Sequence, residues 1–169
     1  MELNNANLRK IKMLVMDVDG VLTDTRIWFD GKEWRRFFSI RDGVGIKLLA
    51  EHGYRLAIIT GSRAEDIRER AKSLGVHHFY EGALDKIPAF EKLVQESQIS
   101  PDEMAYIGDD IFDLPLIDKV GIGITVPEAV PEVLEKVKNV TKAPGGMGAV
   151  REVCDLILKY GAYAKEGPA

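Results

Sequence analysis

Short apolar runs alternate with amphipathic helical patterns along most of this chain, and this alternation limits the fold more than any other feature. The expected strands cover approximately residues 13–16, 55–60, 77–80, 104–107, 121–126 and 139–141. The expected helices cover residues 43–51, 64–73, 86–96, 113–117, 127–137 and 147–160. Strands that alternate with helices in this way build a parallel sheet that is wrapped by helices. The sequence therefore predicts an α/β fold with a Rossmann-like, doubly wound parallel sheet.

One segment, residues 26–39, interrupts this alternation and is typical of a β-hairpin. Two β-prone runs flank Asp30-Gly31, and Asp-Gly between such runs is a strong hairpin signal. The segment carries both tryptophans and three of the six phenylalanines, which is much apolar surface for a two-stranded flap in water. This aromatic hairpin could fold back onto its own domain. We favour burial against another subunit.

Composition narrows the class of protein. With 169 residues, of which 46% are hydrophobic, the chain fits one globular domain, 1–169, with a frayed end at 164–169. The net charge of -4 and the lack of a dense Lys/Arg run argue against a nucleic-acid partner. A single cysteine, Cys154, excludes an intrachain disulfide and fits a reducing compartment. Because no apolar stretch could span a bilayer and Met1 to Asn7 is polar, we expect no membrane partner and a cytoplasmic location.

A pair of carboxylates follows the first expected strand. Asp17 and Asp19 would point the same way if the extended backbone continued, because alternate side chains of a strand share one face. Gly20 then lets the chain turn away. Such a pair can hold a magnesium ion and attack a phosphate, although an acidic turn after a strand has the same composition.

Two more expected strands end in polar groups. Thr60-Gly61 follows the second strand, and Asp109-Asp110 follows the fourth. Lys86 opens an amphipathic helix and could supply a cation. Each feature alone has an ordinary structural explanation, as a turn, a helix N-cap or a solvated lysine. The ordered set rarely arises by chance, and the carboxyl ends of strands are where open α/β sheets bind ligands.

The ordered motifs at 17–24, 59–62, 85–86 and 108–113 resemble those of the haloacid dehalogenase-like phosphohydrolases. Segments 21–24, 41–46 and 145–155 are similar to the family of 3-deoxy-D-manno-octulosonate 8-phosphate phosphatases. That family belongs to a cap-less branch, which also includes phosphatases of nine-carbon sugar acid 9-phosphates. The resemblance implies a magnesium-dependent phosphatase of a phosphosugar acid, with a hairpin flap, no cap domain and a homotetrameric assembly built by the hairpin.

The resemblance also implies roles for the polar residues. Asp17 would be the nucleophile, and Asp19 would protonate the leaving group and then activate water. The implied magnesium ligands are the Asp17 carboxylate, the Asp19 backbone carbonyl and the Asp109 carboxylate, with Asp110 beside them as a direct ligand or a neighbour. Asp113 would either orient Lys86 or cap the following helix.

Substrate binding is implied for a further group. Thr60 and the Gly61 amide would bind the phosphoryl oxygens, Lys86 would offset their charge, and Arg41 would bind the sugar carboxylate. Ser62 and Met147 stand where this family usually has arginines, so a nine-carbon substrate remains an alternative. A phosphosugar mutase would carry a cap insertion between the first two motifs. A non-catalytic binding module would have lost a motif carboxylate, and all of them are present.

Overall fold

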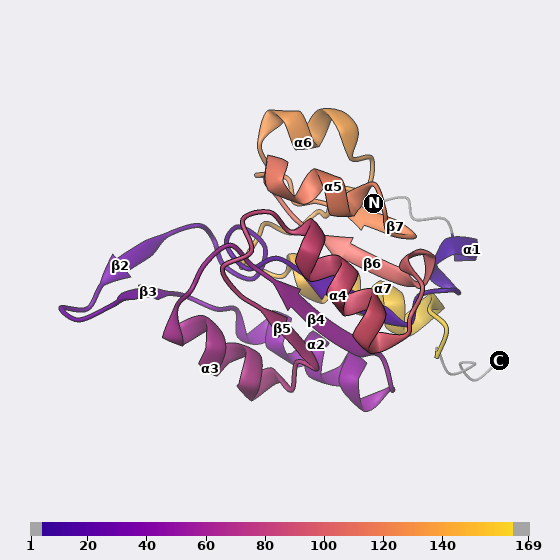
Figure 1. Ribbon diagram of the computed structural model, residues 1–169, viewed down its shortest axis with the longest axis horizontal. Coiled ribbons are helices and arrows are strands. Elements are labelled where there is room, and N and C mark those ends of the chain that lie inside the picture. Colours follow the sequence, from indigo (N-terminus) through magenta and orange to yellow (C-terminus); the bar gives the residue numbers. More distant parts are fainter. Residues whose placement is uncertain (1–4, 164–169) are drawn as a thin grey trace.

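The computed structural model describes residues 5–163 and confirms the predicted α/β architecture (Figure 1). Five parallel strands form one sheet in the order β5-β4-β1-β6-β7. These strands are β1 (Met13–Met16), β4 (Arg55–Ile59), β5 (His78–Tyr80), β6 (Met104–Ile107) and β7 (Ile122–Ile124). From β1 the chain first builds the β4 and β5 side of the sheet and then crosses to β6 and β7. The strand order therefore reverses between β1 and β6, and the carboxyl end of β4 lies beside this point.

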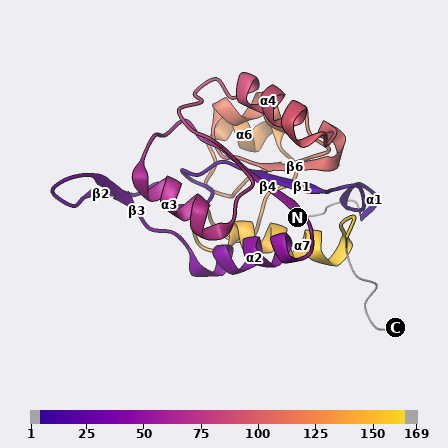
Figure 2. The same cartoon turned by 60° about the horizontal axis from the view of Figure 1, so that its bottom comes forward.

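Helices cover both faces of the sheet (Figure 2). One face carries α2 (Ile40–Glu51) and α7 (Ala149–Tyr160), and the other carries α4 (Ile87–Ser97) and α6 (Pro131–Lys136). The remaining helices are α1 (Asn5–Leu8), which contacts α7, α3 (Glu65–Leu74), which contacts α2, and α5 (Leu114–Ile117), which contacts α4. Short 3-10 turns cover Pro101–Glu103 and Ile111–Asp113. Among residues 5–163, no helix combines the length and the apolar character that crossing a bilayer requires.

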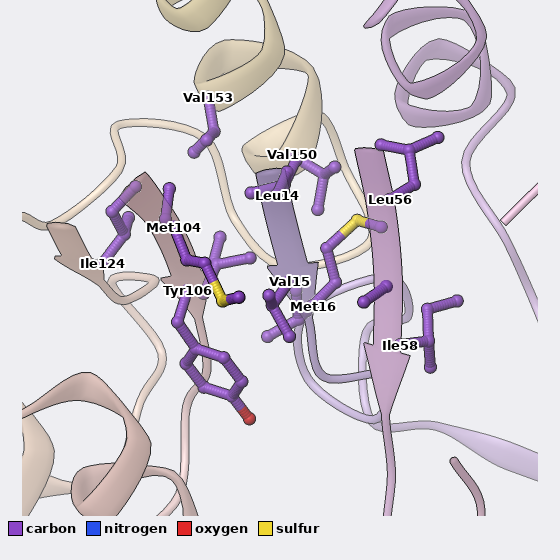
Figure 3. Packing of buried hydrophobic residues seen from close by; sticks show 14 of the residues in the cluster. Leu14, Val15, Met16, Leu56, Ile58, Met104, Tyr106, Ile124, Val150 and Val153 are labelled. Carbon is purple, nitrogen blue, oxygen red and sulfur yellow. The ribbon is translucent and has the colours of Figure 1, made fainter. Parts of the chain in front are cut away.

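The core lies between the central strands and the helices on both sides. All residues of β1 and β6 are buried, as expected for parallel strands that are covered on both faces. Val150 and Val153 of α7 belong to the same buried cluster as Leu14 of β1 (Figure 3). The Tyr106 ring extends from β6 toward the carboxyl end of the sheet, so its hydroxyl leaves the apolar core.

Several element boundaries differ from the expected ones. Helix α2 begins at Ile40 because the Ser39 hydroxyl accepts the Asp42 amide at 3.2 Å and caps the helix. The prediction of a strand at 139–141 was wrong, because only an isolated β-bridge joins Val140 to Thr125. Helix α6 begins with Pro131 instead of residue 127, because proline suits the first helical position. The end predicted to fray, 164–169, lies outside the described residues, and the single domain 1–169 stays a prediction.

The aromatic hairpin is confirmed as an antiparallel pair, β2 (Ile27–Phe29) with β3 (Trp34–Arg36). It projects from the side of the body toward which the strand arrows point (Figure 1). Trp28 is 46%, Trp34 55% and Phe37 65% exposed, so these three rings do not fold back onto their own domain, whereas Phe38 packs against the core. The rings pack mainly on one another, with Trp28 stacked on Phe37 at 6.3 Å between centroids.

Helices α2 and α7 pack closely beneath the sheet. A Cβ added to Gly45 of α2 would lie 2.8 Å from Arg151 Cδ, 3.0 Å from Cys154 Cβ and 3.3 Å from Arg151 Cα. The buried Asp42 carboxylate joins the same helices, since it accepts the amides of Gly148 at 3.2 Å and Arg151 at 2.7 Å. The absence of a side chain at position 45 therefore sets the distance between the two helices.

We predict that Gly45→Ala destabilises the protein by about 1–3 kcal/mol, the usual effect of overpacking. The sign of this change in the free energy of unfolding is diagnostic. At an unconstrained helix position, replacing glycine by alanine would stabilise the protein by about 1 kcal/mol. Gly43→Ala is the matched control in the same helix, because the atoms nearest to its added methyl all belong to side chains, those of Arg70 and Leu74, whereas Gly45 also faces the Arg151 backbone. Urea denaturation of both variants measures the difference. A Gly45→Ala protein as stable as the parent would contradict the close packing.

Candidate active site

A cavity of about 340 Å³ opens at the carboxyl ends of β1, β4 and β6. Apart from Arg41, every residue to which the sequence assigned a role lines it. The lining residues are Asp17, Asp19, Thr25, Thr60, Gly61, Ser62, Ala83, Leu84, Lys86, Asp109, Asp110, Phe112 and Asp113. Motifs that are up to 96 residues apart in sequence meet here because neighbouring parallel strands end at one edge of the sheet.

A buried lysine between two carboxylates forms the floor of the cavity. Lys86 Nζ lies 2.8 Å from Asp17 Oδ1 and 2.5 Å from Asp113 Oδ1, and all three residues are buried. The Tyr106 hydroxyl donates to the same Asp113 oxygen at 2.5 Å. Two carboxylates and a hydroxyl thus surround an ammonium that would be costly to bury without partners. The structure places Lys86 as part of a fixed ion-pair network and not as a solvated lysine.

The second oxygen of Asp113 holds the backbone that follows β6. Asp113 Oδ2 accepts the amides of Asp109 at 2.9 Å and Asp110 at 3.1 Å. No side-chain hydrogen bond caps α5 itself. Of the two roles that the sequence left open for Asp113, the geometry therefore shows contact with Lys86, together with a cap on the 3-10 turn before α5.

The loop after β1 presses against Asp109. Gly20 has φ +89°, and a Cβ placed there would lie 1.9 Å from Asp109 Oδ2. Glycine is needed for this close approach as well as for the left-handed turn. Asp109 Oδ1 is buried and has no hydrogen-bond partner among residues 5–163. An unpartnered buried carboxylate oxygen in a polar cavity points to a cation that the chain itself does not supply.

The electrostatics of the cavity agree with a cation site. Burial raises the pKa of Asp17 to about 7, a shift that Asp113 increases and that Lys86 opposes. Burial also raises the pKa of Asp109 to about 8, and the Asp17 charge adds to this shift. Neighbouring buried carboxylates hold their protons because their negative charges would repel one another.

The donor set fits magnesium, which prefers carboxylate and carbonyl oxygens. Asp17, Asp109 and Asp113 each offer one oxygen within 4.8 Å of the others. Because protein donors use both Asp113 oxygens, Asp17 and Asp109 are the better candidates. Asp110 also lines the cavity, and its side chain caps the following 3-10 turn by accepting the Ile111 amide at 2.6 Å.

Asp19 is held by residues whose role the sequence did not reveal. Arg36 of β3 binds it through Nε to Oδ1 at 2.5 Å and through Nη2 to Oδ2 at 3.2 Å. The Ser62 hydroxyl donates to Oδ2 at 2.6 Å. Strand alternation indicates that Arg35 and Arg36 face opposite ways, but no local signal says which one reaches Asp19. Tyr106 was missed for a similar reason, since a strand tyrosine resembles any core aromatic.

The phosphate-binding candidates lie at the end of β4. Thr60 is buried, and its hydroxyl accepts the Ser62 amide at 3.1 Å. A Cβ on Gly61 would come within 3.0 Å of the Leu84 side chain, so the wall of the cavity is closely packed there. Both residues face the cavity that contains Asp17.

Arg41 lies outside this cavity. It is exposed and lines a separate hollow of about 550 Å³, together with Lys142, Arg151 and Lys159. A third hollow of about 400 Å³ lies between the two, since it shares Asp109 with the first and Met147 with the second. Within one described chain, Arg41 and Asp17 therefore do not share a site.

Comparison with known proteins gives the family. A family model described as haloacid dehalogenase-like hydrolase matches residues 77–151. The chain is 45% identical over 149 residues to the 3-deoxy-D-manno-octulosonate 8-phosphate phosphatase of Yersinia pestis, covering 88% of this chain and 80% of that protein. The crystal structure of a Yersinia pestis phosphatase of the same name superposes with a TM-score of 0.91 at 42% identity, covering 96% of this chain and 88% of that one.

A second solved structure carries ligands. The Moraxella catarrhalis phosphatase of this name, in complex with a magnesium ion, a phosphate ion and KDO, has a TM-score of 0.89 at 38% identity, covering 95% of this chain and 92% of that one. The chain therefore belongs to the haloacid dehalogenase-like hydrolases and, within them, to the family of 3-deoxy-D-manno-octulosonate 8-phosphate phosphatases.

We predict that the metal-free protein loses stability as the pH rises from about 4 to about 8, because Asp17 and Asp109 bind protons more tightly when folded. Their contribution is fully present below their ordinary pKa of 3.8 and is lost through the raised values near 7 and 8. Magnesium should therefore raise Tm more near pH 8 than near pH 5. Asp109→Asn should flatten both dependences. Thermal unfolding with chelator or magnesium measures this, and a Tm response to magnesium that is equal at both pH values would contradict it.

Proposed function

We propose that this chain is a magnesium-dependent phosphatase that hydrolyses 3-deoxy-D-manno-octulosonate 8-phosphate to KDO and phosphate. The observation that carries the proposal is the buried Asp17, paired with Lys86 and adjacent to the unpartnered Asp109 oxygen. The curated relatives of that name supply the substrate, and the Moraxella catarrhalis complex supports the binding of magnesium, phosphate and KDO.

The first chemical step follows from the position of Asp17. Its carboxylate attacks phosphorus in line, a bond forms from Asp17 to phosphorus, and the bond from phosphorus to the sugar oxygen breaks. The resulting aspartyl-phosphate divides one difficult displacement into two easier ones. Lys86 lies 2.8 Å from the nucleophile and offsets negative charge, while Thr60 and the Gly61 amide bind the phosphoryl oxygens.

Asp19 acts as the general acid in the first step and as the general base in the second. It donates a proton to the departing sugar oxygen and then takes one from the water that attacks the aspartyl-phosphate. The second attack breaks the bond between Asp17 and phosphorus and releases phosphate. Asp17, the Asp19 carbonyl and Asp109 would hold magnesium, with Asp110 beside them, and the ion would supply positive charge against the phosphoryl oxygens.

We also propose a homotetramer in which the aromatic hairpin is buried between subunits. About half of the surface of Trp28, Trp34 and Phe29 is exposed in the single chain. Apolar surface of this kind marks a protein contact, and closed symmetric assemblies are the usual result. A neighbouring subunit would also bring its own surface close to the open cavity, where the described part of the chain forms no cap domain that could exclude water.

Phosphate release from a panel of substrates tests the proposed function. We expect the highest kcat/KM for 3-deoxy-D-manno-octulosonate 8-phosphate, activity lost on chelation and restored by magnesium, and no turnover by Asp17→Asn. The panel includes a nine-carbon sugar acid 9-phosphate and a hexose phosphate. A nine-carbon substrate that is turned over more efficiently would replace the proposed substrate, whereas full activity after exhaustive chelation would refute the magnesium requirement.

If the protein is a tetramer whose subunits close one another's sites, its disruption should reduce activity on a large substrate more than on a small one. Trp28→Glu combined with Phe37→Glu should give smaller species in analytical ultracentrifugation, because charges would enter the buried contact. These species should lose activity on the sugar acid more than on an aryl phosphate. Lys32→Glu, a charge change at another exposed position in the hairpin turn, is the matched control. Smaller species with full activity on the sugar acid would show that each chain completes its own site.

A further inference from the structure

Arg36 differs from the rest of the hairpin in its burial. Its side chain is only 9% exposed, while the aromatic residues around it stand about half in solvent. Its neighbour Arg35 points the other way and pairs with Asp30 at 2.7 Å and Glu33 at 3.2 Å near the hairpin turn. One of two adjacent arginines is therefore turned into the body of the molecule.

The Arg36 guanidinium joins three segments that are distant in sequence. It binds Asp19 after β1 through two nitrogens, Ser62 after β4 at 3.2 Å, and Asp66 in the first turn of α3 at 3.4 Å. The Arg36 backbone amide also donates to Asp66 Oδ2 at 2.9 Å. Asp66 thus fixes both the backbone and the guanidinium of Arg36. Because the guanidinium is planar and binds Asp19 through two nitrogens, this also fixes the Asp19 carboxylate.

The consequence for Asp19 is a fixed orientation. The Asp19 carboxyl is 36% exposed, and an exposed aspartate exchanges rotamers on a fast timescale unless it is held. Arg36 and Ser62 together occupy both of its oxygens. Arg36 itself does not line the cavity, so any effect on chemistry must pass through the two cavity residues that it binds, Asp19 and Ser62.

The two Asp19 oxygens are not equivalent. Oδ1 accepts one bond, from Arg36 Nε at 2.5 Å, whereas Oδ2 accepts two, from Arg36 Nη2 at 3.2 Å and from the Ser62 hydroxyl at 2.6 Å. Of these donors only the Ser62 hydroxyl can turn its hydrogen away, so Oδ2 is the oxygen that exchanges a proton in the proposed mechanism. It gives that proton to the departing sugar oxygen and takes one from water.

We propose that Arg36 is a positioning residue that anchors Asp19 at the cavity, so that the base of the aromatic hairpin sets the geometry of proton transfer. This inference rests on the proposed function, because it assigns Asp19 the acid and base role. It gives the hairpin a second role in catalysis that does not depend on contacts between subunits.

Substrates whose leaving groups differ in basicity distinguish a loss of Asp19 positioning from a general loss of activity. A sugar or simple alkyl phosphate needs a proton on its departing oxygen, whereas 4-nitrophenolate leaves without one. We expect Arg36→Ala to lower kcat on alkyl phosphates by about tenfold or more, less than the ~10²- to 10⁴-fold expected for Asp19→Asn. KM should stay within about twofold, and the burst of 4-nitrophenolate in rapid mixing should change by less than about threefold, because proton donation does not limit that step.

Arg35→Ala is the matched control, since it removes the adjacent arginine and its ion pairs but leaves the Asp19 network intact. Arg36→Lys should restore part of the lost kcat, because it keeps the charge without the fork. Asp66→Asn should give the same pattern more weakly, although Asp66 touches neither Asp19 nor the cavity. These two milder variants decide the question if Arg36→Ala does not fold.

Three results would overturn the inference: equal losses on both leaving groups, no loss, or a faster enzyme. Assays of the wild-type protein on the same substrates distinguish failure of this inference from failure of the proposed function. If it cleaves 4-nitrophenyl and simple alkyl phosphates but not the octulosonate phosphate, the proposed substrate is wrong, and the contrast between Arg36→Ala and Arg35→Ala still decides the inference. If it cleaves no phosphate monoester, both fail.

Discussion

The buried Lys86 ammonium, held between Asp17 and Asp113, is the interaction on which the rest of the site depends. It ties the start of α4 to the end of β1 and to the turn after β6. Replacing one carboxylate would leave the buried ammonium with a single charged partner, and replacing both would leave it unpaired, which costs far more than the loss of a surface ion pair. Asp113 extends the network further, because its second oxygen holds the backbone that carries Asp109. The nucleophile and the proposed metal ligand thus share one electrostatic frame.

The close approach of backbone segments at glycine residues is the second constraint on the arrangement of Asp17, Lys86, Asp109 and Asp113. A Cβ on Gly108 would lie 2.3 Å from Asp113 Cγ, and one on Gly145 would lie 1.8 Å from the Gly20 carbonyl oxygen. The glycine-rich segment near the C-terminal helix therefore packs directly on the loop that follows β1. Gly20 in turn presses on Asp109. Glycine at these positions lets three loops stack at the carboxyl end of the sheet, where side chains would keep them apart.

The aromatic hairpin connects this rigid frame to the solvent-exposed side of the molecule. Its outer residues are exposed and apolar, whereas Arg36 at its base joins the network of Asp19, Ser62 and Asp66. Asp17 therefore sits on a buried ion pair, while Asp19 is held by a peripheral element. This division places the proposed nucleophile on the buried core and the proposed acid and base residue against the base of the hairpin.

The sequence by itself determined the sheet, the hairpin and the set of residues that meet at Asp17. Strand and helix periods are local, and parallel strands necessarily bring their carboxyl ends to one edge. The tertiary structure alone decided that Arg36 and not Arg35 reaches Asp19, that Tyr106 binds Asp113, and that Arg41 lies in a separate hollow. These outcomes depend on how a hairpin and two helices dock onto the sheet. No local pattern records that docking, because it is set by packing between segments that are far apart in the chain.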